Sequence, residues 1–292
     1  MSLLSPRILQ RLSRSKLLVR EAVASTGIGE RPSRARGAGI EFADHRQYQL
    51  GDDIRYLDQH VLARLGEHYI RQYTLYQQLP VTILLDASAS MKYGQPGKFP
   101  FSRELTAALG YAALVGGDRV LVGAFSGNSL NWFTPLHGVR RAQALFAWLE
   151  QLRPRGTTDL IRTTRQAMPR LLSGGLLVIV SDWMFPGAQE ALKVLRLGRQ
   201  ELVGIQVLAP EEEDSALLGG GEIRMVDSET GHEIEISLDP VMRDRYREHF
   251  ERWRLSVRSA LSDNQGLYLR VRSDDDLEQL LLRDWRMAGL IA

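Results

Sequence analysis

An aspartate is followed by two serines at alternate positions in the stretch VTILLDASASMKYG, which spans residues 81–94. The apolar run before Asp86 favours a buried β-strand, so Asp86, Ser88 and Ser90 come at the end of that strand. Alternate spacing lets one short turn direct all three side chains at a single point. Oxygen atoms are the ligands that Mg²⁺, Mn²⁺ and Ca²⁺ prefer. The stretch is therefore either a polar loop or a site for a hard metal ion.

Two other segments offer oxygen atoms that could complete such a site. Asp182 follows the apolar run LLVIVS, and the loop RPRGTTD offers Thr157 and Thr158 just before an expected helix. Ligands of open parallel sheets bind beyond the carboxyl ends of the strands, so we expect Asp86 and Asp182 on one rim, with the threonine loop beside them. Having few carboxylate ligands, a bound metal would take one more oxygen, most naturally from an acidic residue of a partner.

The elements expected to position these residues alternate between strands and helices from residue 80 onwards. Strands are expected at 81–88, 119–126, 176–182 and 201–210, and helices at 101–116, 140–152, 159–172 and 187–200. Apolar strands alternating with amphipathic helices predict an α/β fold with a doubly wound, mostly parallel, Rossmann-like sheet. A hairpin and a long helix are expected at about 222–264, followed by a strand and a short helix.

The first part of the chain lacks this alternation. We expect residues 1–79 to form an N-terminal extension of helical and irregular structure, and residues 80–292 to form the α/β domain. Within the extension, the pattern predicts a helix over 3–24 and a Gly/Arg-rich loop over 26–40. The loop has no phosphate-binding G-x-x-x-x-G-K-[ST] motif.

Residues 1–36 are strongly basic, with a local net charge of +6. An arm that binds nucleic acid or an anionic membrane is one interpretation. Because aromatic residues are not interleaved with the basic ones, we favour an amphipathic helix with a solvated cationic face. Its inward-facing residues would be Leu4, Ile8, Leu12 and, at the far end, Leu18.

Composition narrows the class of protein. The 292 residues are 44% hydrophobic and 25% charged, with a net charge of +2 and no cysteine. The lack of cysteine excludes disulfides, thiolate metal sites and a cysteine nucleophile. Residues 1–20 show no secretory leader, since arginine or lysine interrupts every apolar run, and the apolar stretches are far shorter than the roughly 20 residues that span a bilayer. A cytoplasmic location is the expectation.

The DASAS motif resembles the D-x-S-x-S metal-ion-dependent adhesion site of von Willebrand factor type A domains. The threonine of TTDL and the aspartate of VSDW match the two remaining elements of that site. The resemblance implies Mg²⁺, Mn²⁺ or Ca²⁺ held directly or through water by Asp86, Ser88, Ser90 and Thr158, with Asp182 acting mainly through water. Thr157 is the alternative threonine, because such families often have glycine there.

A second resemblance covers roughly residues 35–285. The stretch GAGIEFADHRQYQLGDDIRYLDQHVLAR is similar to the signature of the bacterial family called domain of unknown function 58. The chain departs from that family at Gln59, where tryptophan is common, and at Thr157. Members resemble cytoplasmic von Willebrand type A proteins encoded beside MoxR-type AAA+ ATPases, which implies a metal-dependent adaptor for such an ATPase.

A separate acidic cluster lies in the extension, in GDDIRYLD. Asp52, Asp53 and Asp58 could form a partner surface or a second cation site. We favour helix capping and ion pairing, with Arg46, Arg55 and Arg64 as partners. The six histidines show no H-E-x-x-H spacing and are expected to be structural or exposed.

Three functions compete for this pattern of residues. The first is a non-enzymatic, metal-dependent protein-interaction module. The second is an enzyme in which the metal processes a phosphoester, but the DASAS, TTDL and SDW loops contain no histidine or glutamate to act as a general base. The third is a nucleic-acid-associated protein that uses the basic tail.

The rim could also be lined by aromatic residues, namely Trp132, Trp148, Trp183 and Tyr93. For Trp183 and Met184, which directly follow Asp182, a partner contact and a packing role both remain open.

Overall fold

A computed structural model describes residues 3–19, 28–37, 41–127, 129–171, 174–185, 187–229 and 231–292. Within them lies a central six-stranded sheet in the order β11-β8-β7-β4-β5-β6. Its strands are β4 (Pro80–Asp86), β5 (Arg119–Ser126), β6 (Ser129–Trp132), β7 (Leu176–Ser181), β8 (Glu201–Leu208) and β11 (Leu267–Arg272). Strand β6 pairs antiparallel with β5, whereas the other neighbours pair in parallel.

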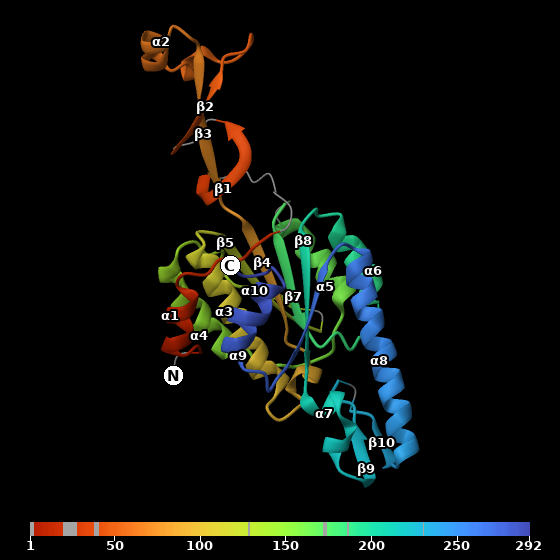
Figure 1. Ribbon diagram of the computed structural model, residues 1–292. Coiled ribbons are helices and arrows are strands. Elements are labelled where there is room, and N and C mark those ends of the chain that lie inside the picture. Colours follow the sequence, from red (N-terminus) through yellow and green to blue (C-terminus); the bar gives the residue numbers. More distant parts are fainter. Residues whose placement is uncertain are drawn as a thin grey trace.

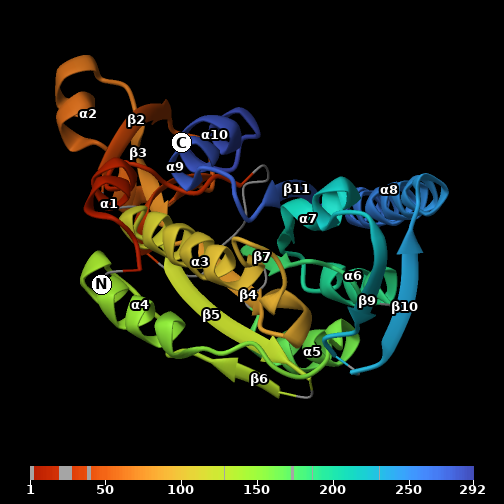
Figure 2. The ribbon, with the colours of Figure 1, turned by 90° about the horizontal axis from the view of Figure 1, so that it is seen from below.

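Helices cover both faces of this sheet (Figures 1 and 2). The first face carries α1 (Pro6–Leu12), α3 (Lys98–Val115), α4 (Ala142–Gln151), α9 (Leu277–Gln279) and α10 (Trp285–Met287). The second carries α5 (Leu160–Ala167), α6 (Ala188–Arg196) and α8 (Pro240–Asp263). Ile83 and Leu85 pack into the core of the first face and Leu84 into that of the second, because successive side chains of a strand point to opposite faces. The predicted α/β fold with a mostly parallel sheet is confirmed.

The N-terminal segment is part of this body. Leu4, Leu12 and Leu17 lie in the core of the first face, and the backbone of Lys16 exchanges hydrogen bonds of 2.9 and 3.1 Å with that of Ala292. The helix predicted over 3–24 is shorter, because α1 ends at Leu12. Residues 13–19 instead extend along the C-terminal end of the chain, where tertiary pairing overrides helix propensity. Residues 20–24 lie outside the described residues.

A second sheet projects from the body (Figure 1). Strands β1 (Ile28–Gly37), β3 (Tyr69–Gln77) and β2 (Glu41–Gln47) pair antiparallel in that order, with a 3₁₀ turn (Ile54–Tyr56) and α2 (Gln59–Leu65) at the far end. The predicted helical and irregular extension is wrong for the three strands, and the predicted loop over 26–40 contains β1. Pairing with β3 organises β1, whose register shifts explain why its sequence shows no regular alternation.

The C-terminal half adds a hairpin at the opposite end of the body (Figure 1). After β8 come α7 (Pro210–Glu213) and a 3₁₀ turn (Ser215–Leu218), then β9 (Gly221–Val226) and β10 (Glu233–Leu238), which pair antiparallel. The predicted hairpin and long helix are confirmed. None of the helices in the described part of the chain combines the length and apolarity needed to cross a membrane.

Candidate functional site

The site begins at the carboxyl ends of two adjacent strands. Asp86 ends β4, and Asp182 directly follows β7, which pairs in parallel with β4. From β4 the chain goes to β5 on one side, and it later returns to β7 on the other side. The strand order reverses between β4 and β7, and such a reversal is where open α/β sheets bind ligands. The two predicted carboxylates therefore meet at one rim.

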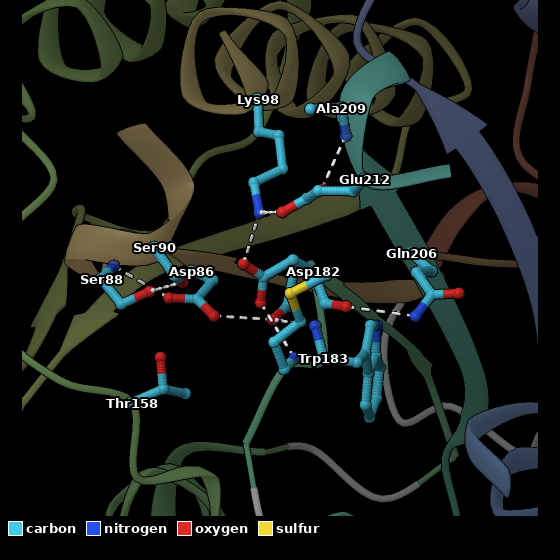
Figure 3. A network of polar contacts seen from close by, with 12 residues as sticks. Asp86, Ser88, Ser90, Lys98, Thr158, Asp182, Trp183, Gln206, Ala209 and Glu212 are labelled. Carbon is cyan, nitrogen blue, oxygen red and sulfur yellow. Dashed lines mark hydrogen bonds and ion pairs between the residues drawn. The ribbon is translucent and has the colours of Figure 1, made fainter. Parts of the chain in front are cut away.

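The loop after β4 gathers the predicted oxygen atoms (Figure 3). Asp86 accepts hydrogen bonds from the backbone N–H of Ser88, at 2.9 Å, and from the hydroxyl of Ser181, at 2.6 Å. The hydroxyl oxygens of Ser88 and Ser90 are 3.0 Å apart. Asp86 and Ser88 are completely buried. A 3₁₀ turn over Ala89–Lys92 follows, so the three side chains stay on one short bend.

Backbone hydrogen bonds attach the threonine loop to this bend. Arg155 N–H donates to the carbonyl of Ala87, and Ala89 N–H donates to the carbonyl of Gly156, each at 2.8 Å. Thr158 is half-buried and its hydroxyl points toward the Asp86–Ser90 bend (Figure 3), whereas Thr157 is exposed. Of the two threonines, Thr158 is the one whose side chain the structure directs to the predicted site.

A buried lysine holds the second carboxylate (Figure 3). Lys98, the first residue of α3, places its Nζ 2.8 Å from Asp182 Oδ2 and 2.6 Å from Glu212 Oε1. The other carboxylate oxygen of Glu212 accepts the backbone N–H of Ala209 at 2.8 Å. Lys98 has no exposed surface, so its charge is balanced within the protein by two carboxylates.

The electrostatic environments of these groups differ. Burial and, after it, the charge of the neighbouring Asp182 raise the pKa of Asp86 to about 7, against hydrogen bonds from Ser181 and Ser88 that oppose the shift. Burial opposes the charge of Lys98, but Asp182 and Glu212 hold its pKa above the usual value. Burial raises the pKa of Glu212 even beside Lys98. We take Lys98 as charged, because its ammonium lies within hydrogen-bond distance of two carboxylates.

With this geometry established, comparison with known proteins places the chain in a family. Residues 44–256, well over half of the chain, match the family described as "Protein of unknown function DUF58". The chain belongs to the DUF58 family. An uncharacterized protein of Mycobacterium tuberculosis is 25% identical over 277 residues, which cover 93% of this chain and 86% of the mycobacterial protein. A protein of Mycobacterium bovis, also uncharacterized, matches with the same identity and coverage.

Solved structures give weaker likenesses to this DUF58 chain. The crystal structure of a conserved hypothetical protein, BatB from Bacteroides thetaiotaomicron, matches at 18% identity with a TM-score of 0.45 and covers 72% of this chain and 98% of its own. An aerotolerance-related membrane protein from Bacteroides fragilis matches at 19% identity with a TM-score of 0.42 and covers 68% and 92%.

Sequence reasoning missed Ser181, Lys98 and Glu212 at the candidate site. Ser181 orients Asp86, Lys98 holds Asp182, and Glu212 holds Lys98. Lys98 offered a signal, because a cation in the first turn of a helix opposes the helix dipole and needs a compensating partner. Ser181 stood beside Asp182 in the VSDW motif. For Glu212, inside a run of three glutamates, the local sequence carried no such signal.

The expectation that Trp183 could line the rim is wrong. Trp183 is completely buried, stacks on Phe185 with ring centroids 6.0 Å apart, and donates its ring N–H to the carbonyl of Ile205 at 3.2 Å. Its φ of 63° lies in the left-handed region, which is uncommon for a bulky residue. Met184 is 37% exposed, and its backbone N–H donates to Asp182. Trp183 thus has the packing role, and Met184 faces the surface.

The residues present fit a hard divalent cation. The donor set consists of two carboxylates and three hydroxyls, all oxygen. The contacts of Asp86 within the described part of the chain are with neutral donors, so its charge lacks a cationic partner there. In those same ranges no group of three or more His, Cys, Asp or Glu side chains could hold a metal ion, so a metal site at this rim would depend on hydroxyl ligands as well as carboxylates.

The second acidic cluster has partners of its own. Asp53 accepts the backbone N–H of Arg55 and pairs with its guanidinium at 2.6 Å, and Arg46 pairs with Asp52 at 2.7 Å. Asp58 caps α2 and contacts Arg71 and His45. The favoured interpretation as capping and ion pairing is confirmed, although Arg71 and His45 stand where Arg64 was expected.

Proposed function

We propose that this DUF58 protein is a metal-dependent protein-interaction module of the von Willebrand factor type A kind, with a metal-ion-dependent adhesion site. Mg²⁺ would be held by Asp86, Ser88, Ser90 and Thr158, with Mn²⁺ or Ca²⁺ as alternatives. The observation that carries the proposal is Asp86, a fully buried carboxylate beside two hydroxyl-bearing neighbours and without a cationic partner among the described residues. A buried charge needs such a partner.

Asp182 has a different role in this proposal. One of its oxygens already contacts the ammonium of Lys98 at 2.8 Å and the other accepts the backbone N–H of Met184 at 3.0 Å. These contacts withdraw charge from the carboxylate, which supports contact with the metal through water. Ser181 orients Asp86 from the opposite side, as outer contacts commonly do around metal ligands.

The proposed role is binding and not turnover. Few direct carboxylate ligands leave the metal short of negative charge, so an acidic residue of a partner protein can complete its ligands. The DASAS, TTDL and SDW loops contain neither histidine nor glutamate to activate a water molecule. The glutamates that the fold brings near are already engaged, Glu212 by Lys98 and Glu229 by Thr158. The proposed partner is a MoxR-type AAA+ ATPase, on the strength of the family resemblance, and the proposed setting is the cytoplasm, in the assembly or remodelling of other proteins.

Metal-dependent capture of a partner tests this function. The tagged full chain is used as bait in native lysate with Mg²⁺ or with EDTA, in the wild-type form, as Asp86→Ala and as Asp244→Ala. Asp244 is an exposed aspartate on α8 and serves as a matched control. Mass spectrometry should recover an AAA+ ATPase with the wild type and the control in Mg²⁺, and lose it in EDTA or with Asp86→Ala. Capture that ignores EDTA and Asp86→Ala contradicts the metal-dependent interaction, and failure to recover any ATPase contradicts the proposed partner.

A further inference from the structure

A carboxylate from a distant part of the chain reaches the proposed metal site. Glu229 lies in the turn between β9 and β10, 71 residues from Thr158. Its two oxygens accept the Thr158 hydroxyl at 3.3 Å and the Thr158 backbone N–H at 3.4 Å. Both oxygens of Glu229 thus lie against the threonine that is directed to the site.

The path of the hairpin explains how Glu229 arrives there. Seen from the carboxyl ends of the strands, β9 and β10 extend from α7 and α8 across to the region of α5, which follows Thr158 (Figure 2). The turn is held in shape, because Asp227 accepts the backbone N–H of Glu229 at 2.8 Å and Gly231 N–H donates to the carbonyl of Asp227 at 2.8 Å. These two hydrogen bonds to Asp227 fix the backbone on either side of Glu229.

The root of the hairpin is joined to the same site. The chain enters the hairpin from α7, where Glu212 binds Lys98, and Lys98 binds Asp182. Tyr246, on the helix that follows the hairpin, donates its hydroxyl to the carbonyl of Glu212 at 2.7 Å. The root therefore contacts the site through Lys98 and the turn contacts it through Thr158.

The strands between these two points are mostly exposed. Within β9, Ile223 is half-buried and its neighbours are exposed, and in β10 the first three residues are exposed. A hairpin with so little buried surface is held chiefly by its two ends, and regions with few buried contacts open at low free-energy cost. The contact of Glu229 with Thr158 can therefore be released without unfolding the body.

The negative charge of Glu229 indicates what could bind beside it. Burial raises the pKa of the Glu229 carboxyl, and like-charge repulsion from Asp182 acts in the same direction. A cation bound at this rim, as in the proposed function, would offset the repulsion between Glu229 and Asp182. An acidic residue beside Thr158 also matches the chemistry proposed for the partner.

We propose that Glu229 is an internal acidic ligand of the metal site, and that the β9–β10 hairpin occupies the position that a partner's acidic residue takes. This inference rests on the proposed function. With the hairpin closed, Glu229 supplies the carboxylate that the metal otherwise lacks. An acidic residue of a partner must displace Glu229, so a partner binds only if its carboxylate competes successfully with Glu229 for the metal.

The test compares Glu229→Gln with Glu235→Gln in the full chain. Glu235 is an exposed carboxylate on the same hairpin, so both variants lose one negative charge from the same element. Mn²⁺ affinity is measured by calorimetry, and the number of exchangeable waters on bound Mn²⁺ by the relaxation rate of water protons. Glu229→Gln should weaken Mn²⁺ binding about tenfold and increase the relaxation rate, because water replaces the carboxylate. Glu235→Gln should match the wild type in both.

Acetate then serves as a probe for the vacated position. Added to the Mn²⁺ complex of Glu229→Gln, acetate should displace water and lower the relaxation rate, whereas the wild type should resist it. Equal acetate sensitivity in wild type and variant overturns the inference. So does a Glu229→Gln variant with the affinity and relaxation rate of Glu235→Gln.

These outcomes separate the inference from the function on which it rests. Mn²⁺ binding that depends on Asp86 but not on Glu229 overturns the internal ligand and leaves the proposed function intact. Wild-type protein that binds Mn²⁺ no better than Asp86→Ala contradicts the proposed function itself, and the internal ligand with it.

Discussion

Asp58 and Asp86 are both buried carboxylates, yet their surroundings are opposite in kind. Their exposed fractions are 5% and 0%, and each accepts backbone N–H groups from the turn that follows it. Asp58 also contacts the guanidinium of Arg71 at 2.8 Å and the ring of His45 at 2.7 Å. Asp86 contacts the neutral hydroxyl of Ser181.

The pKa values of the two carboxyls move in opposite directions as a result. Hydrogen bonds from Arg71 and His45 hold the pKa of Asp58 well below its usual value, whereas burial and the charge of Asp182 raise the pKa of Asp86 to about 7. Asp58 is stabilised within the projecting sheet and serves the fold there. Asp86 has no cationic partner among the described residues, and a carboxyl with so strongly raised a pKa is characteristic of a functional site.

Lys98→Met should have the largest effect on stability, because it would leave Asp182, like Asp86, buried without a cationic partner among the described residues. The substitution leaves Asp182 and Glu212 buried together without their shared cation. Breaking a buried ion pair by removing one partner typically costs about 3–5 kcal/mol, and we expect a loss of that size in the free energy of unfolding, measured with urea in EDTA. The double variant Lys98→Met/Glu212→Gln should recover part of the loss. A Lys98→Met protein of wild-type stability would contradict the role given to this lysine.

Asp86→Asn should remove the dependence of stability on metal. In EDTA we expect the variant to be at least as stable as the wild type, because the amide removes a buried charge that has no cationic partner. With Mg²⁺ at about 100 times its dissociation constant, binding should stabilise the wild type by about 2.7 kcal/mol and the variant not at all. Thermal unfolding with and without Mg²⁺ measures both. If Mg²⁺ stabilises Asp86→Asn as much as the wild type, Asp86 is not a metal ligand, and its lack of a cationic partner among the described residues has no bearing on metal binding.

Thr158→Val tests which threonine belongs to the Asp86 site. Loss of one hydroxyl ligand should weaken Mn²⁺ binding about tenfold, the equivalent of about 1.4 kcal/mol. Thr157→Val is the matched control, because Thr157 is exposed and its carbonyl is already bonded to Gly127 N–H at 2.6 Å. Calorimetry with Mn²⁺ compares the two, and the reverse order of affinities would identify Thr157 as the ligand.

Asp58→Asn should have the smallest effect on stability, and the size of that effect should depend on pH. At pH 7 we expect a lower unfolding temperature, because Arg71 and His45 lose their anionic partner. A carboxyl whose folded pKa is depressed contributes stability above its unfolded pKa, near 3.8, and that contribution is lost as the pH falls through the folded pKa. The gap between variant and wild type should therefore narrow between about pH 5 and pH 3. A gap that widens on acidification would show that Asp58 is not held by its cations.

The local sequence pattern was sufficient to predict many of the strands and helices of this molecule. The apolar runs of β4, β7 and β8 are long enough to indicate buried parallel strands, and the alternation in DASAS predicted side-chain oxygens gathered on one bend, where the Ser88 and Ser90 hydroxyls do meet. The hairpin and α8 were also visible, because Asp239 and Pro240 form a helix start that periodicity and capping both mark.

Pattern failed where an element depends on a distant partner. Strand β1 contains proline, glycine and several arginines and becomes a strand through its pairing with β3. Residues 13–19 resemble a continued helix but extend along the C-terminal end. In both segments the deciding hydrogen bonds join residues far apart in the chain, so no short window of sequence carries the information.

The same division runs through the site. Residue types and spacing marked Asp86, Ser88, Ser90, Thr158 and Asp182 as candidate ligands, since the chemistry of a hard cation depends on which atoms a turn can offer. The fold brings them to one rim, and metal binding there stays a prediction. Folding decided which charges and hydroxyl groups meet those atoms: Lys98 at Asp182, Ser181 at Asp86 and Glu229 at Thr158. Electrostatic interactions act through space and not along the chain, and for that reason the balance of charge at this rim exists only in the folded protein.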